Sequence, residues 1–224
     1  MNFNAVLLSL RLAATVSIML SLIAIPLAYG LAFTKWRGKF LLESVVALPL
    51  VLPPTVLGFY ALIVLGPRGV IGKLAQSVLG HPLAFTFSGL VLASLVYSLP
   101  FAVQPLMNSF ESLDRRLLDA SALLGANPMR TFLRITLPLS WPGLLTSLIL
   151  SFAHTLGEFG VVLMVGGNLP GITRTASIDI YDRVQEMDYG GAHAMSLLLL
   201  ATSFAVLAAV YAVNRRAWSP WRSR

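Results

Sequence analysis

The sequence predicts an all-α protein that crosses a membrane about five times. Hydrophobic residues make up 57% of its 224 residues and charged residues only 11%, whereas about 25% of the residues in soluble domains are charged. The charges separate long uncharged runs, the first of which has 23 residues between Arg11 and Lys35. A helix of that length measures about 34 Å, enough for a hydrocarbon core of about 30 Å. The absence of cysteine excludes a disulfide framework and a metal–thiolate site.

Five apolar runs predict the transmembrane helices, at residues 12–34, 44–67, 82–110, 135–157 and 189–214. The first is unlike a cleaved signal peptide, because its basic cluster follows the apolar run. Pro53 and Pro54 interrupt the second run and should bend it, since proline removes a helical hydrogen bond. Such a bend serves either helix packing or a pathway wall, and the sequence leaves both open. Pro138 and Pro142 fall in the first turns of the fourth run.

Three segments between these runs have distinct compositions. Residues 66–82 are rich in turn formers and predict a loop, in which His81 is solvated. Residues 159–173 are uncharged but short and glycine-rich, which favours a re-entrant or interfacial segment over a full span. Residues 174–189 are the most acidic part of the chain. Because no internal repeat or low-complexity linker is evident, residues 1–224 are expected to form a single transmembrane domain.

The segment between the third and fourth runs predicts two short helices joined by a sharp turn. Ser112 can cap a helix that starts near Leu113, and Gly125 lies where that helix would end. Asn127 and Pro128 then provide an N-cap and a first helical residue for the next helix. These helices are too short to cross a bilayer and too apolar to stand free in water.

The distribution of positive charge predicts the orientation in the membrane. With the N-terminus outside and the C-terminus in the cytoplasm, eleven lysine and arginine residues lie inside and five outside, as the positive-inside rule requires. The inner group includes Arg222 and Arg224 of the basic tail. This orientation puts the two short helices in the cytoplasm and the acidic residues 174–189 outside.

The sequence does not support an enzymatic site. It has no phosphate-binding glycine loop, so the chain is not expected to hydrolyse ATP. Its three histidines, at positions 81, 154 and 193, show no metal-binding spacing. Ser151 and His154 are neighbours on one helix and cannot align as nucleophile and base. No catalytic residue and no metal ligand is therefore predicted.

Glu158 stands out, because an acidic residue at the end of a membrane span is costly and often functional. It is either part of a gate or a helix-end carboxylate paired to an arginine, and the sequence leaves both open. For His154, one turn earlier, the favoured interpretation is a packed polar residue. The spans also carry hydroxyls, which suit the brief passage of a divalent oxoanion but also serve helix packing: Ser17, Thr55, Ser94, Thr146, Ser151 and Thr155.

The cytoplasmic segment resembles the "EAA" loop of ABC-importer permeases. The resemblance rests on Asp119-Ala120-Ser121, on Gly125, and on Ile135-Thr136-Leu137-Pro138, with Asp119 and Ser121 as conservative departures. It implies the type I importer permease fold and a coupling loop at residues 113–136 whose first helix rests in a cleft of an ATPase subunit. The alternative is an amphipathic helix lying on the membrane. The implied coupling residues are Arg115, Arg116, Asp119, Ala120, Ser121, Gly125 and Pro128.

Three further segments resemble permeases of the molybdate type: residues 48–56, Leu156-Gly157-Glu158-Phe159-Gly160, and residues 168–175. The resemblance implies a pathway or gate formed by Pro53, Thr55, Ser151, Thr155, Gly157, Glu158 and Gly160. It also implies contact between an external binding protein and Asn168, Pro170, Gly171, Thr173, Arg174 and Thr175. The alternative for this segment is an ordinary surface loop.

The resemblance as a whole implies the permease subunit of a molybdate importer in the bacterial inner membrane. The expected partners are a second copy of the chain, two ABC ATPase subunits in the cytoplasm and an external molybdate-binding protein. ATP and Mg²⁺ would bind to the ATPase, and this chain would hold no cofactor. Sulfate and tungstate remain alternative substrates. A stand-alone channel or secondary carrier is the alternative from another class, although such carriers usually show an inverted repeat.

Overall fold

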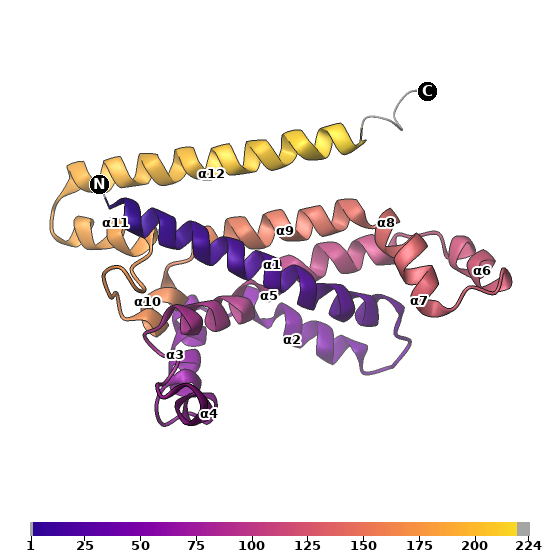
Figure 1. Cartoon of the computed structure of the whole chain (residues 1–224), viewed down its shortest axis with the longest axis horizontal. Coiled ribbons are helices and arrows are strands. Elements are labelled where there is room, and N and C mark those ends of the chain that lie inside the picture. Colours follow the sequence, from indigo (N-terminus) through magenta and orange to yellow (C-terminus); the bar gives the residue numbers. More distant parts are fainter. Residues whose placement is uncertain (1, 219–224) are drawn as a thin grey trace.

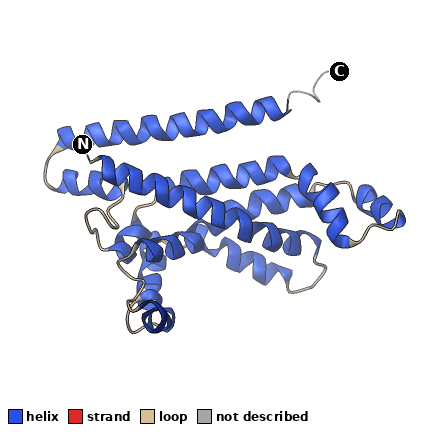
Figure 2. Cartoon of the chain, viewed as in Figure 1, coloured by secondary structure: helices blue, strands red, loops and turns tan. Residues whose placement is uncertain are grey.

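The computed structural model describes residues 2–218 of the protein as helices joined by short loops (Figure 2). Three helices are long and apolar enough to cross a membrane: α1 (Phe3–Phe33), α5 (Phe87–Glu111) and the Tyr189–Ala209 part of α12 (Tyr189–Trp218). Two further spans are bent pairs of shorter helices. Counting each pair as one span confirms the prediction of about five. Arg222 and Arg224 of the predicted basic tail lie outside the described residues.

The centre of the molecule is a bundle of α1, α5 and α9 (Trp141–Leu156), which lie side by side along the long axis (Figure 1). Leu12, Val16 and Leu20 of α1 belong to one buried apolar cluster that also contains Leu90, Leu106 and Phe110 of α5. Such burial contributes roughly 1.5–3 kcal/mol for a large apolar side chain when the reference state is water. The bundle is therefore the core of the molecule, and α2, α10 and α12 pack against it.

The second predicted span is broken. Helix α2 (Lys39–Val51) ends before Leu52, and α3 (Pro54–Leu65) starts at an angle of 109° to it. Leu52 and Pro53 are extended, and Pro54 has no N–H to continue the ladder of α2. With 13 residues, α2 reaches only about 20 Å and does not cross a core of about 30 Å by itself. Helix α3 consequently leaves the bundle sideways (Figure 1).

The segment at residues 66–82 is not the predicted loop, because it contains the ten-residue helix α4 (Val70–Leu79). Val70, Leu74 and Val78 recur at helical spacing, a pattern that the turn formers on either side obscured. Gly72 lets α4 approach closely, since a Cβ there would overlap the Gly66 carbonyl. His81 follows the helix and is exposed, as expected.

The fourth predicted span also differs from the expectation of one helix with two prolines in its first turns. Only Pro142 lies in the first turn of α9. Pro138 belongs to the short helix α8 (Leu137–Leu139), which follows the π-helical turn η1 (Phe132–Thr136). The helical stretch Pro128–Leu139 is bent by 67° relative to α9. The bend occurs at Ser140, directly before Trp141, where α9 starts, and Pro142 is the second residue of the new helix.

Two short helices, α10 (Gly160–Gly166) and α11 (Ala176–Gln185), lie at the end of the bundle opposite α6 (Figure 1). Helix α10 is too short to cross a membrane and packs on α3 and α5, which agrees with the predicted re-entrant or interfacial segment. The acidic stretch is mostly helix α11. Arg183 binds two of its carboxylates, those of Asp179 and Asp188, each at 2.8 Å. This network fixes the turn between α11 and α12.

Asp188 provides a pH-dependent contribution to stability. Its carboxylate accepts a hydrogen bond from the Gly191 backbone N–H at 2.9 Å. That bond and the Arg183 guanidinium lower the pKa of Asp188 below its usual range. A lowered folded-state pKa stabilises the fold above the unfolded-state pKa, and this contribution is lost as the pH falls through the folded-state value.

We expect Asp188→Asn to lower the unfolding temperature of the purified protein slightly at pH 7, and by less as the pH falls below about 4. Thermal unfolding of both proteins between pH 3 and pH 7 measures this difference. An equal difference at every pH would contradict the assigned role of the carboxylate. Glu186→Gln, which removes an exposed acid from the same turn, is the matched control.

Candidate functional site

The predicted cytoplasmic helix is present but starts later than expected. Helix α6 (Arg115–Leu123) is capped by Asp114, whose carboxylate accepts from the Arg116 N–H at 2.9 Å. Ser112 is not this cap, because α5 continues to Glu111 and the Ser112 hydroxyl donates to the Ser109 carbonyl. The sequence pattern misplaced the cap because aspartate and serine both serve at helix N-termini.

The turn after α6 has the predicted construction. Gly125 has φ +77°, a left-handed conformation that glycine adopts without strain. Asn127 caps the next helix, α7 (Pro128–Thr131), by accepting from the Arg130 N–H at 2.8 Å. The hydroxyls of Ser121 and Thr131 lie 2.8 Å apart and join the two helices. The helical hairpin is therefore held by its own contacts at one end of the long axis of the molecule (Figure 1).

Most of the predicted coupling residues are exposed on this hairpin. Ser121 is the exception, because its side chain is buried between α6 and α7. Leu123 and Leu124 were not predicted, although they are 89% and 88% exposed at the tip. Two adjacent leucines on a polar helix, directly before a turn glycine, were the signal that could have found them. Exposed coupling residues are Arg115, Arg116, Asp119, Ala120, Gly125 and Pro128.

The break in the second span meets the short helix α10. A Cβ on Gly160 would lie 2.8 Å from the Cβ of Pro54, and one on Gly58 would lie 2.7 Å from the Cβ of Met164. Real Cβ atoms do not approach so closely, so both glycines are required by the packing of α3 on α10. Two of the predicted gate residues, Pro53 and Thr55, are exposed beside this contact. Broken helices that meet in this way are typical of transport pathways.

The predicted pathway residues of α9 divide into two groups. Ser151 is buried and donates to the Ser147 carbonyl of its own helix at 2.7 Å, and Thr155 is buried against Ser98 of α5. Gly157, at the end of α9, is exposed. The hydroxyls of Ser151 and Thr155 therefore serve helix packing in this conformation. Of the predicted pathway residues on α9 and at its end, Gly157 is the one on the surface.

Glu158 follows α9 and is 4% exposed. Neither of its carboxylate oxygens has a hydrogen-bond partner among the residues that the structure describes. The alternative of a helix-end carboxylate paired to an arginine therefore does not describe this conformation. A buried carboxylate without a partner is unfavourable, which makes Glu158 sensitive to any movement of α9 and α10.

The external segment at residues 168–175 is a structured turn. Arg174 donates to Asn168 at 2.7 Å, and Asn168 donates to Asp182 of α11 at 2.8 Å. Thr173 is buried, and its hydroxyl donates to the Gly166 carbonyl. Thr175 is buried as well. Of the six residues predicted to contact a binding protein, only Pro170 and Gly171 are fully on the surface.

Residues 21–219 match the family described as binding-protein-dependent transport system inner membrane components. The chain belongs to this family. The permease is 50% identical over 214 residues to the molybdenum transport system permease protein ModB of Azotobacter vinelandii, covering 96% of this chain and 95% of the relative. It is 37% identical to ModB of Escherichia coli K12 over 206 residues, 92% of this chain and 90% of the relative.

Solved structures share the fold. A chain of a bacterial ABC transporter that imports the acidic polysaccharide alginate superposes with a TM-score of 0.79, at 18% identity, covering 96% of this permease and 79% of that chain. A chain of the MetNI methionine ABC transporter in an inward-facing conformation gives a TM-score of 0.76 at 16% identity. The superposition covers 96% of this permease and 95% of that chain. The permease therefore has the ABC-importer permease fold that the coupling-loop resemblance implied.

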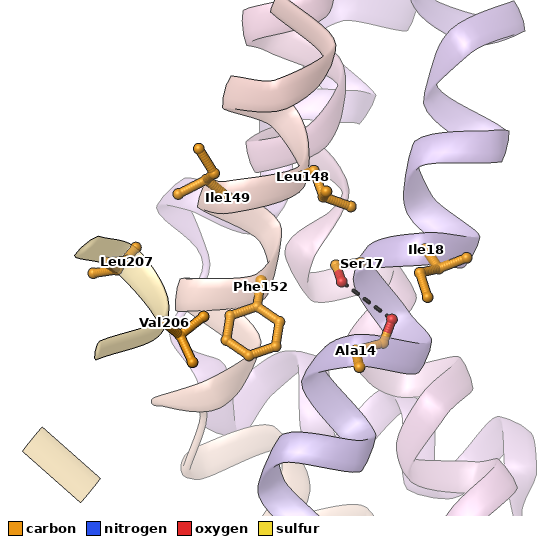
Figure 3. Close-up of a pocket in the computed structure, with 8 residues that line it drawn as sticks. All are labelled: Ala14, Ser17, Ile18, Leu148, Ile149, Phe152, Val206 and Leu207. Carbon is orange, nitrogen blue, oxygen red and sulfur yellow. Dashed lines mark hydrogen bonds between the residues drawn. The ribbon is translucent and has the colours of Figure 1, made fainter. Parts of the chain in front are cut away.

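A cavity of about 210 Å³ between α1, α9 and α12 is not a site for an anion in this permease (Figure 3). Its only hydroxyl is that of Ser17, which already donates to the Ala14 carbonyl at 3.1 Å. The remaining lining side chains are apolar and offer no hydrogen-bond donor: Ala14, Ile18, Leu148, Ile149, Phe152, Val206 and Leu207.

The contact of α3 with α10 leads to a packing prediction. We expect Gly160→Val to destabilise the permease by about 1–3 kcal/mol, because the new side chain overlaps Pro54. Thermal unfolding of the purified permease measures the change. Gly30→Ala is the control, because no atom lies within 4 Å of the added Cβ and alanine favours the helix. Equal unfolding temperatures for the two variants would contradict the close contact.

The burial of Glu158 leads to a functional prediction. Glu158→Gln removes the charge and keeps the shape, so assembly of the transporter should be unchanged. If the side chain acts in the gate, uptake should fall about tenfold, corresponding to about 1.4 kcal/mol in the barrier. Uptake and complex yield are measured on the same preparation. Unchanged uptake would remove Glu158 from the mechanism.

Proposed function

We propose that this permease forms the transmembrane pathway of an ATP-driven molybdate importer. The observation that carries the proposal is the 50% identity, over nearly the whole length of both chains, to a molybdenum transport permease. ModB proteins of Haemophilus influenzae and Escherichia coli K12 are 40% and 37% identical, and a putative molybdenum transport permease of Bacillus subtilis is 35% identical. A sulfate transport permease of Chlorella vulgaris is 33% identical. The identities therefore favour molybdate over sulfate.

We further propose that the hairpin of α6 and α7 receives movement from a cytoplasmic ATPase, which binds the ATP and Mg²⁺. Leu123 and Leu124 support this role, because large apolar side chains that are almost fully exposed indicate a partner surface. Three aromatic rings support the transmission of this movement from the hairpin to the bundle. The ring centroid of Phe132 lies 5.0 Å from that of Tyr29 of α1 and 6.4 Å from that of Phe110 of α5. A force on the hairpin would thus reach the bundle.

The proposed assembly is a homodimer with two ATPase subunits inside and one binding protein outside. The charge distribution supports an external N-terminus and a cytoplasmic C-terminus. In that orientation, the turn at Pro170 and Gly171 faces the binding protein. The transport cycle is alternating access, in which closure of the ATPase dimer moves α6 and opens the pathway outward.

Uptake by the reconstituted transporter tests the substrate. The permease is assembled with its ATPase and binding protein in liposomes, and uptake of molybdate, tungstate and sulfate is measured with and without ATP. We expect ATP-dependent uptake of molybdate in preference to sulfate. Uptake by the permease alone would contradict the proposal and favour a channel or secondary carrier.

The coupling surface is tested by Leu124→Asp, which should abolish copurification of the ATPase, because a charge replaces an exposed apolar contact. The fold should survive, since the residue is 88% exposed. Met187→Asp introduces the same charge at an exposed position between α11 and α12 and is the control. Cysteines at Ala120 and Ala122 should crosslink to the ATPase. Failure of both crosslinks would contradict the proposed coupling.

A further inference from the structure

His154 occupies an aromatic slot between α5 and α9. Its ring stacks on Phe101 with a centroid distance of 4.0 Å and an interplanar angle of 24°, and Tyr97 lies at 4.7 Å. All three side chains are half-buried. The imidazole is thus held in one plane by two neighbours but keeps part of its surface open. This packing agrees with the packed polar residue that the sequence favoured, and the open part of the ring adds a surface that can meet a ligand.

A chain of hydroxyls determines which ring nitrogen carries the proton. Ser98 Oγ lies 2.9 Å from His154 Nδ1 and 2.9 Å from Thr155 Oγ1. Either hydroxyl can donate in the Ser98–Thr155 bond; because Thr155 has no other acceptor among the described residues, we infer that it donates to Ser98. Ser98 must then donate to Nδ1. The structure therefore assigns the proton to Nε2, which becomes a fixed N–H donor.

The face of α5 beside His154 is too polar to meet lipid. Tyr97, Phe101, Gln104 and Asn108 recur at helical spacing and form one stripe along the helix. None of the four is fully buried. The amides of Gln104 and Asn108 make no side-chain hydrogen bond to the described residues, although unpaired amides facing hydrocarbon are costly. We infer that this stripe, residues 97–108 of α5 with His154, faces water.

Resting on the proposed function, we propose that His154 Nε2–H donates a hydrogen bond to the oxoanion as it passes along this stripe. A neutral N–H donor suits passage, because hydrogen bonds to neutral donors are weaker than those to charged ones and do not trap the ion. Glu158, one turn further along, is 4% exposed. Ser98 acts as a positioning residue that orients the ring.

Accessibility of the site is tested by thiol labelling. The chain has no cysteine, so His154→Cys carries a single thiol when the ATPase and the binding protein are also free of cysteine. We expect a membrane-impermeant anionic thiol reagent to modify it in the assembled transporter and molybdate to slow the modification at least threefold. Ile18→Cys, exposed on α1, and the buried Ala102→Cys are the controls. Labelling no faster than at Ile18 would place the residue against lipid or a second copy and overturn the proposal.

The donor is tested by a pair of substitutions. His154→Gln can restore a donor near Nε2, whereas His154→Phe keeps the stacking and removes the donor. We expect the Phe variant to lower molybdate uptake by about 10-fold or more, as for the loss of one hydrogen bond to a charged group. The Gln variant should recover most of the uptake. ATP hydrolysis stimulated by the loaded binding protein should change less than uptake.

The outcomes separate this inference from the proposed function. Absence of molybdate uptake by the wild-type transporter would refute the function itself. Wild-type uptake that both variants retain would refute the role of His154 alone. Equal loss in both variants, with normal assembly, would assign a packing role to the ring and also overturn the inference.

Discussion

In a bilayer, backbone amides and polar side chains have no water to bind in the hydrocarbon core, so each needs a protein partner or an aqueous space. The α1–α5–α9 bundle meets this requirement with helical backbones, and some of its serines bond to carbonyls of their own helix, as Ser151 does to Ser147 and Ser17 to Ala14. The broken segments meet it differently. At Leu52 and Pro53 the helical ladder stops, and the freed groups are tolerated because α10 packs against this point. The location of irregular backbone thus marks the functional part of the molecule.

Specific side-chain contacts also hold the segments at the two ends of the permease. At the inner end, the hairpin of α6 and α7 is held by the bond between Ser121 and Thr131 and presents Leu123 and Leu124 outward. At the outer end, α10 is locked onto α3 by Gly58 and Gly160. Helices α5 and α9 run between these ends and carry the stripe beside His154. A movement of the hairpin would therefore act on a rigid bundle and reach the contact between α3 and α10 without bending the helices.

Much of the architecture could be predicted from local sequence signals. Uncharged runs indicated the spans, and Gly125, Asn127 and Pro128 indicated the hairpin. The errors occurred where two local signals competed. Asp114 displaced Ser112 as the cap, and the apolar period of α4 was hidden by flanking glycines and a proline. Glu158 was recognised by its cost in a membrane, but its lack of a partner depends on residues of other helices.

The sequence by itself determined the helical class, the number of membrane-crossing segments and the composition of the coupling hairpin. Each of these follows from hydropathy, charge or capping within a few residues. Only the tertiary structure decided that α3 turns 109° from α2, that Thr173 points inward and that Ser98 reaches His154 across 56 residues. The physical reason is that burial and side-chain hydrogen bonds depend on neighbours brought together by packing. A proline predicts that a helix bends, whereas the surface on which the bent helix rests sets the direction.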